Sequence, residues 1–119
     1  MSVTRDQVDA ICASRPGSTQ GQPPEELSCW KVGGKMFACF SSATDANGVS
    51  VKCPDAETAT MLIDAGAAIK ARYFHKSWVT LPFADTTMDE IEHRVAVSYD
   101  KIFSGLPKAI RNTLPQGAA

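Results

Sequence analysis

A Gly-Gly pair between two short stretches suited to β-strands constrains the fold of this chain more than any other feature. Residues 29–40 have the sequence CWKVGGKMFACF, which the pair Gly33-Gly34 divides into two halves. Glycine adopts positive φ without steric cost, so the pair can form the primed two-residue turn that the twist of β-strands favours. The sequence therefore predicts a β-hairpin that turns at residues 33–34.

A two-residue loop at this position also predicts which residues lie opposite one another. The expected cross-strand pairs are Val32 with Lys35, Lys31 with Met36, Trp30 with Phe37, and Cys29 with Ala38. Cross-strand partners share a face of the sheet. One face would carry Ser28, Trp30, Lys35 and Phe37, and the other would carry Leu27, Cys29, Met36, Ala38 and Phe40. Cys29 and Cys39 would then lie on opposite faces, which disfavours a disulfide between them.

The remaining chain adds helices before and after the hairpin, together with further strands. Thr4 with Gln7 and Thr87 with Glu90 have the spacing of capping boxes and predict two helix starts. Pro54 marks the start of a short helix between them.

Alternating apolar residues predict further strands at residues 49–53 and 78–83. Residues 18–26 and 67–77 are interpreted as loops. The resulting order, α-β-β-β-α-β-α-α, predicts an α+β fold in which an antiparallel sheet of about four strands has helices packed mainly on one face.

Length and composition favour one soluble domain. A chain of 119 residues with 44% apolar residues suits a single domain over residues 1–119. Within it, we expect residues 113–119 to form a flexible tail. No apolar run approaches the ~20 residues that span a membrane, and the first residues lack the apolar core of a signal peptide. We therefore expect a cytoplasmic protein without a membrane partner.

Cysteine usage agrees with that compartment. The four cysteines are Cys12, Cys29, Cys39 and Cys53, and no two of them have Cys-x-x-Cys spacing. We expect buried or half-buried thiols in a reducing environment.

Charge separates along the chain although the net charge is only −1. Residues 65–84 contain Lys70, Arg72, His75 and Lys76 and no carboxylate. Acidic residues gather instead in the segments expected to be helical. The cations therefore lie in the predicted strands and in residues 67–77, the segment that precedes the last predicted strand.

Several separated motifs occur together in this chain. They are Cys12 with Pro16-Gly17, WKVGGKMFA at 30–38, VSVKC at 49–53, YFHKSWV at 73–79, Ser98-Tyr99, and Leu106-Pro107. In this order they resemble the MmcQ/YjbR family of small bacterial proteins. The resemblance extends over nearly the whole chain and implies a compact α+β domain of the CyaY-like kind. It also implies DNA binding, a role assigned to the family largely from comparison of folds. One departure from the family pattern is Phe74, which stands where many members carry a small or amide residue.

The expected surface for such binding is an aromatic and basic sheet face. If helices cover Met36 and the valines of the strands, the opposite face displays Trp30, Lys35, Phe37, Ser50, Lys52, Trp78 and Thr80. Aromatic rings between lysines can stack on bases while the lysines neutralise phosphates. The candidate nucleic-acid-binding residues are Trp30, Lys31, Lys35, Phe37, Lys52, Arg72, His75, Lys76 and Trp78.

Three other interpretations of the same residues stay open. The aromatic rings would fill a second core beneath a helix or beneath residues 70–76, or they would form a dimer interface. The same face would alternatively serve a protein-interaction or chaperone-like adaptor. The expected partners are thus DNA or another nucleic acid, or a protein, for a monomer or weak homodimer.

No catalytic, metal or cofactor site is expected. His75 lacks a partner in the sequence, and His, Cys, Asp and Glu do not recur at the spacings of metal ligands. The first helix offers only Asp6 and Asp9, which gives little support to a metal-carrying role like that of other CyaY-like folds. We expect Tyr99 to bury its ring and to hydrogen-bond through its hydroxyl.

Overall fold

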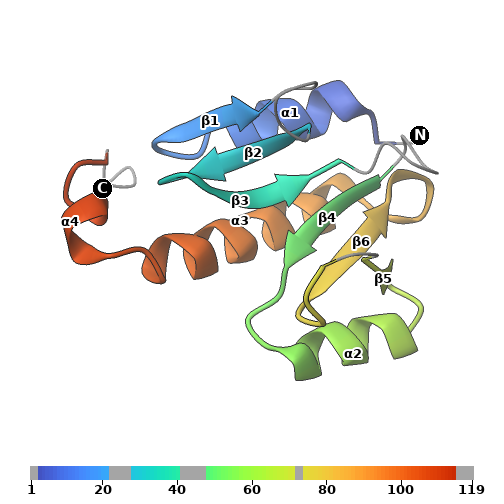
Figure 1. The fold of residues 1–119 in the computed structure, drawn as a ribbon. Helices are drawn as coiled ribbons and strands as arrows, with labels where there is room; N and C mark the ends of the chain where they lie inside the picture. Colours follow the sequence, from blue (N-terminus) through green and yellow to red (C-terminus); the bar gives the residue numbers. More distant parts are fainter. Residues whose placement is uncertain (1–2, 22–27, 41–47, 72–73, 115–119) are drawn as a thin grey trace.

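The chain forms one antiparallel sheet of six strands in the order β1-β2-β3-β4-β6-β5 (Figure 1). This architecture comes from a computed structural model that describes residues 3–21, 28–40, 48–71 and 74–114. The strands are β1 (Ser18–Gly21), β2 (Cys29–Val32), β3 (Lys35–Cys39), β4 (Gly48–Lys52), β5 (Ile69–Lys70) and β6 (Trp78–Pro82).

The predicted hairpin and the two predicted later strands are confirmed as β2, β3, β4 and β6. The expected number of about four strands is wrong, because β1 and β5 lie inside the segments interpreted as loops. Both are edge strands. β1 has the polar sequence STQG without apolar alternation, and β5 has only two residues, both exposed. Pairing with the neighbouring strand, rather than their own sequence pattern, makes these segments extended.

The helices begin where the capping residues predict. Thr4 accepts a hydrogen bond from the Gln7 N–H, and the Gln7 side chain accepts one from the Thr4 N–H, so the capping box of α1 (Arg5–Ala13) is complete. Asp55 caps α2 (Ala56–Asp64), and Thr87 caps α3 (Met88–Ser104) by accepting the N–H of Glu90. A 3-10 turn, η1 (Phe83–Asp85), and a short α4 (Lys108–Arg111) complete the elements.

Two of the helices cover one face of the sheet. α3 packs along β3 and β4, and α1 packs against α3 and β1, so both lie behind the sheet in Figure 1. α2 contacts β5 and β6 at the other end of the sheet. The core lies between the sheet and these helices, and its fully buried side chains include Val8, Val32, Phe37, Val51, Val79, Leu81, Ile91 and Val95.

The hairpin turn is as predicted, but the register of its strands changes partway along. Gly33 and Gly34 have φ of 59° and 83°, as a primed turn requires. The predicted pairs of Val32 with Lys35 and Lys31 with Met36 are confirmed.

Beyond these pairs a β-bulge shifts the register, so that Trp30 lies opposite Ala38 and Cys29 opposite Cys39. The predicted pairs of Trp30 with Phe37 and Cys29 with Ala38 are therefore wrong. Phe37 is the extra residue of the bulged strand.

The bulge places Cys29 and Cys39 on the same face, which corrects the prediction that they lie on opposite faces. Both are nevertheless free thiols, as are Cys12 and Cys53, and all four are buried. Burial raises the pKa of Cys12 to about 12 and that of Cys39 to about 11, so these thiols are protonated and weakly nucleophilic.

Candidate functional site

The ladder of cross-strand pairs defines the sheet face that α1 and α3 leave uncovered. Ser50 pairs with Cys39 on one side and Thr80 on the other, and Lys52 pairs with Trp78. Because partners share a face, the open face is defined by the following residues: Cys29, Lys31, Met36, Cys39, Ser50, Lys52, Trp78 and Thr80. The valines at 49, 51 and 79 and Leu81 alternate with them and face the helices, as predicted.

Two of the predicted platform aromatics face the helices instead. The indole N–H of Trp30 donates to the Asp9 carboxylate of α1 over 2.9 Å. The Phe37 ring is completely buried and meets the ring of Tyr99 from α3 edge to face, at 5.4 Å between centroids. The prediction that Trp30 and Phe37 belong to an uncovered platform is therefore wrong.

Met36, which was expected under the helices, is half-buried on the open face. Large apolar residues occur on both sides of the β2–β3 hairpin, so composition does not reveal which side the helices cover. Asp9 and Tyr99 decide it by supplying partners for Trp30 and Phe37. The expected role of Tyr99 is confirmed, because its ring is buried and its hydroxyl donates to the carbonyl oxygen of Pro16 over 2.6 Å.

Trp78 lies on the open face, as predicted, and has an aromatic partner that the candidate residues did not include. Its ring stacks on Phe74, with centroids 4.8 Å apart and planes inclined by 25°. Trp78 is only 9% exposed, while Phe74 is half-buried. The only sequence signal for Phe74 was its position in a segment that mixes aromatic and cationic residues.

A chain of hydrogen bonds holds the segment that carries these rings. The Lys52 ammonium donates to the Ser77 hydroxyl over 2.7 Å, and that hydroxyl lies 2.9 Å from Nδ1 of His75. The Ser77 N–H also donates to Nδ1, which this pattern assigns as the acceptor nitrogen. His75 thus has a partner that sequence reasoning missed, and the Trp78 N–H donates to its carbonyl oxygen over 2.9 Å.

A buried serine from α3 fixes the sheet at the bulge. The Ser98 hydroxyl donates to the Phe37 carbonyl oxygen over 2.6 Å and accepts the Lys52 N–H over 2.9 Å. Ser98 is fully buried, so both backbone groups depend on it for satisfaction. Ser98 of α3 therefore ties the helix to the backbone of β3 at Phe37 and of β4 at Lys52.

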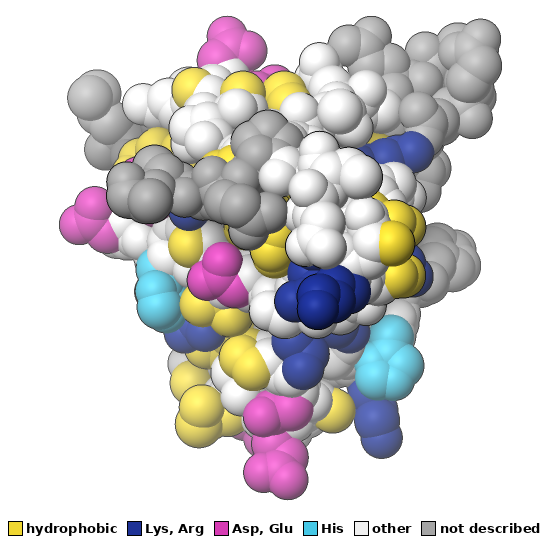
Figure 2. Space-filling view, turned by 90° about the vertical axis from the view of Figure 1, so that its left-hand side faces the viewer, with side chains coloured by type: hydrophobic (Ala, Val, Ile, Leu, Met, Phe, Trp, Pro, Cys, Tyr) yellow, Lys and Arg dark blue, Asp and Glu magenta, His cyan; other side chains and the backbone are white. Residues whose placement is uncertain are grey.

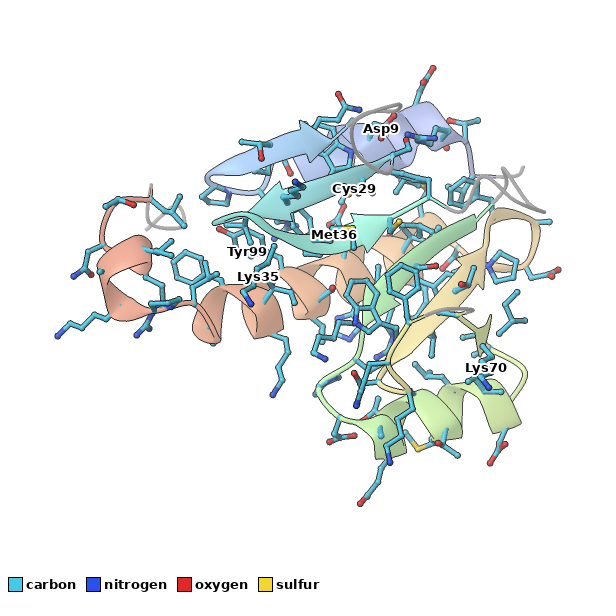
Figure 3. All side chains as sticks on the ribbon, viewed as in Figure 1. Asp9, Cys29, Lys35, Met36, Lys70 and Tyr99 are labelled. Carbon is cyan, nitrogen blue, oxygen red and sulfur yellow. The ribbon has the colours of Figure 1, made fainter. Side chains whose placement is uncertain are left out.

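A hollow of about 530 Å³ lies on the open face, which we call the sheet hollow. Its described lining comprises Cys29, Lys31, Gly34, Lys35, Met36, Phe74 and Trp78, and none of these seven residues carries a carboxylate. Figure 3 shows Cys29, Lys35 and Met36 on β2 and β3, with Asp9 and Tyr99 on the helices behind. Figure 2 views the side at which α4 lies in Figure 1 rather than the open face, and Lys and Arg side chains gather near the middle of that side.

The structure thus unites some predicted residues and separates others. Lys31, Lys35 and Trp78 line the sheet hollow, and Lys52 pairs with Trp78 beside it. Lys76 lines a different hollow of about 660 Å³ over α2, together with the carboxylates of Glu57 and Asp64. Arg72 lies outside the described residues.

Among the residues that the structure describes, no group of three or more His, Cys, Asp or Glu side chains is placed to hold a metal ion. Within the same part of the chain, no helix has both the length and the apolar character needed to cross a lipid bilayer.

Comparison with known proteins gives a family and a fold. The family model described as YjbR matches residues 13–101. The chain is also similar to the crystal structure of a Deinococcus radiodurans protein with the family domain DUF419. The TM-score is 0.79 at 24% identity over 97% of this chain and 91% of that one. No curated protein matches the chain.

Proposed function

The chain belongs to the YjbR family. We propose that it binds nucleic acid and that the open sheet face is the binding surface. Lys31, Lys35 and Lys52 provide cations for phosphates, and Phe74, stacked on the buried Trp78, provides aromatic surface for bases. Trp30 and Phe37 have no part in this surface, because both face the helices.

The observation that carries the proposal is the composition of the sheet hollow. A stacked aromatic pair and two lysines line one concavity. Cations in such a concavity favour a polyanion, and each phosphate contact adds a salt-dependent contribution to affinity. Aromatic rings next to those cations add a contribution that requires bases.

We further propose a binding role rather than a catalytic one, in the cytoplasm, for a monomer or weak homodimer. The four buried free thiols support a reducing compartment. The raised pKa values of Cys12 and Cys39 make both unsuitable as nucleophiles.

The salt dependence of oligonucleotide binding tests the proposal. We expect log affinity to fall linearly with log salt between about 50 and 200 mM. The double variant Lys31→Ala with Lys35→Ala should lower the slope by about 0.7 per lysine that contacts a single-strand phosphate. Lys70→Ala is the matched control, because Lys70 is an exposed lysine on β5, far from Lys35 in Figure 3.

The alternative is a protein-interaction or chaperone-like adaptor that uses the same face. It predicts weak oligonucleotide binding at low salt that does not respond to the two lysine substitutions. That result would contradict the nucleic-acid proposal. A steep slope that falls only in the Lys31 and Lys35 variant would contradict the adaptor.

A further inference from the structure

Building on the proposed function, we propose that the sheet hollow takes one unpaired base, so that the preferred ligand is single-stranded nucleic acid. The flanking phosphates of that nucleotide would lie on Lys31 and Lys35 at its rim. This assigns both a location and a strand preference to the binding.

The aromatic wall of the hollow is the first support. Phe74 and Trp78 both line the concavity, and they stack on each other at 4.8 Å. Trp78 is only 9% exposed, so the half-buried Phe74 offers the accessible ring and Trp78 supports it from behind. Such a ring can stack a base of any identity, because every base has a π-face. Little preference for base sequence is therefore expected.

The opposite side of the hollow is formed by Met36 on β3. β3 and β6 are separated by β4, which places their backbones about 10 Å apart at the usual strand spacing. A thioether packs favourably against aromatic rings, and bases present such rings. The hollow therefore offers apolar contact from two sides to a single planar group.

The aromatic wall is also held in place before any ligand arrives. The hydrogen bonds from Lys52 to Ser77 and between Ser77 and His75 connect residues 75–77 to β4. Trp78 itself is paired with Lys52 in the sheet. A wall that is already ordered loses less conformational entropy on binding.

Duplex nucleic acid cannot use this wall without disruption. The bases of a duplex are stacked on both neighbours, so reaching Phe74 and Trp78 requires unstacking. A duplex therefore retains only phosphate contacts with Lys31 and Lys35. Single strands gain the stacking contribution in addition.

The test compares three labelled probes with equal numbers of phosphates per strand, using fluorescence anisotropy on the whole protein. They are a thymidine oligomer, an abasic oligomer of the same length, and a duplex of that length. At about 200 mM salt, where phosphate contacts weaken, we expect the thymidine oligomer to bind about tenfold or more tightly than the other two.

Substitution of the wall gives a second measurement. Phe74→Leu should lower affinity for the thymidine oligomer toward that for the abasic oligomer and leave abasic binding unchanged. Phe103→Leu is the matched control, because Phe103 stacks on Tyr99 on the helix side of the sheet. If Phe74→Leu fails to fold, the comparison of probes on the unaltered protein decides.

Two outcomes separate the two proposals. Equal affinity for the thymidine and abasic oligomers, with a steep salt dependence, would overturn the base site and leave phosphate binding by the open face intact. Absence of measurable binding to all three probes at low salt would overturn both.

Discussion

At the scale of single residues, the two tryptophans of the sheet have different partners, one polar and one aromatic. Trp30 is amphipathic, and its N–H needs an acceptor once the ring is buried. Asp9 on α1 supplies that acceptor, while Trp78 has Phe74 as a neighbour instead. The two tryptophans therefore occupy opposite faces although both belong to strands.

Replacement of Asp9 tests how much this partner contributes. Asp9→Ala leaves the Trp30 N–H without its acceptor and should lower the free energy of unfolding by about 1–2 kcal/mol. Asp9→Asn keeps an acceptor oxygen and loses only the partly exposed ion pair with Arg5. Urea unfolding measures both, and equal losses in the two variants would show that the hydrogen bond to Trp30 contributes nothing.

At the scale of elements, the β2–β3 hairpin depends on both glycines of its turn, for different reasons. Each has positive φ, but a Cβ added at Gly33 would lie 2.6 Å from Leu106 Cδ1 and 3.2 Å from Ile110 Cγ2. A Cβ added at Gly34 would have no neighbour within 4 Å. Of the two turn glycines, only Gly33 packs closely against the α3–α4 connection and α4.

This difference predicts unequal costs for the same substitution. Gly34→Ala should lose about 1 kcal/mol of stability from the left-handed backbone alone. Gly33→Ala should lose about 2 kcal/mol or more, because it adds the overlap with Leu106. Thermal unfolding of the two variants checks the order, and a Gly33→Ala protein as stable as Gly34→Ala would contradict close packing at the tip.

The sequence predicts the elements well and their register poorly, and the bulge explains why. Turn glycines, capping residues and alternation are local signals, so the hairpin, the helix starts, β4 and β6 could all be predicted. The extra residue Phe37 leaves no mark in composition, yet a shift of one position reverses which side chains share a face. β1 and β5 carry no apolar alternation, because β1 has the sequence STQG and β5 has only two residues, so no local signal marks either strand.

The parts of the candidate site that follow from the alternation of side chains along a strand could be predicted from the sequence. The parts that follow from tertiary contacts could not. The alternation of β4 and β6 predicts that Lys52 and Trp78 share a sheet face, and this is confirmed, since the two residues are cross-strand partners. The stacking of Phe74 and the link between Lys52 and His75 through Ser77 bring residues from separate elements together. No spacing along the chain encodes those contacts.

At the scale of the whole molecule, the distribution of charged side chains matters more for the proposed binding than the net charge. A net charge of −1 gives no overall attraction to nucleic acid. The proposed binding therefore depends on the local field of the sheet hollow, whose lining includes Lys31 and Lys35. The second hollow, over α2, combines Lys76 with two carboxylates and lacks such a field.

The buried thiols predict how the stability of the whole molecule depends on pH. Burial raises the pKa of Cys12 from 9.0 to about 12, with the Asp9 charge as a smaller cause. The native state keeps the proton that the unfolded chain loses above pH 9.0. The contribution of the Cys12 thiol to the free energy of unfolding is thus complete below pH 9.0 and declines as pH rises toward 12.

Urea unfolding across this pH range measures the decline. Cys12→Ala removes the titrating group, and its stability should fall less steeply with pH than that of the unaltered protein, by up to about 1.4 kcal/mol per pH unit. Lysines and tyrosines titrate equally in both proteins, so the difference isolates the thiol. Parallel pH profiles would contradict a protonated, buried Cys12.

The two outermost strands of the sheet also limit how copies of the molecule can associate. The edge strand β1 consists of two hydroxyl residues, a glutamine and a glycine. The edge strand β5 has only two residues, one of which is Lys70. Short, polar or lysine-bearing edges are poor templates for another chain, so open-ended growth into fibrils by strand addition is disfavoured at both margins.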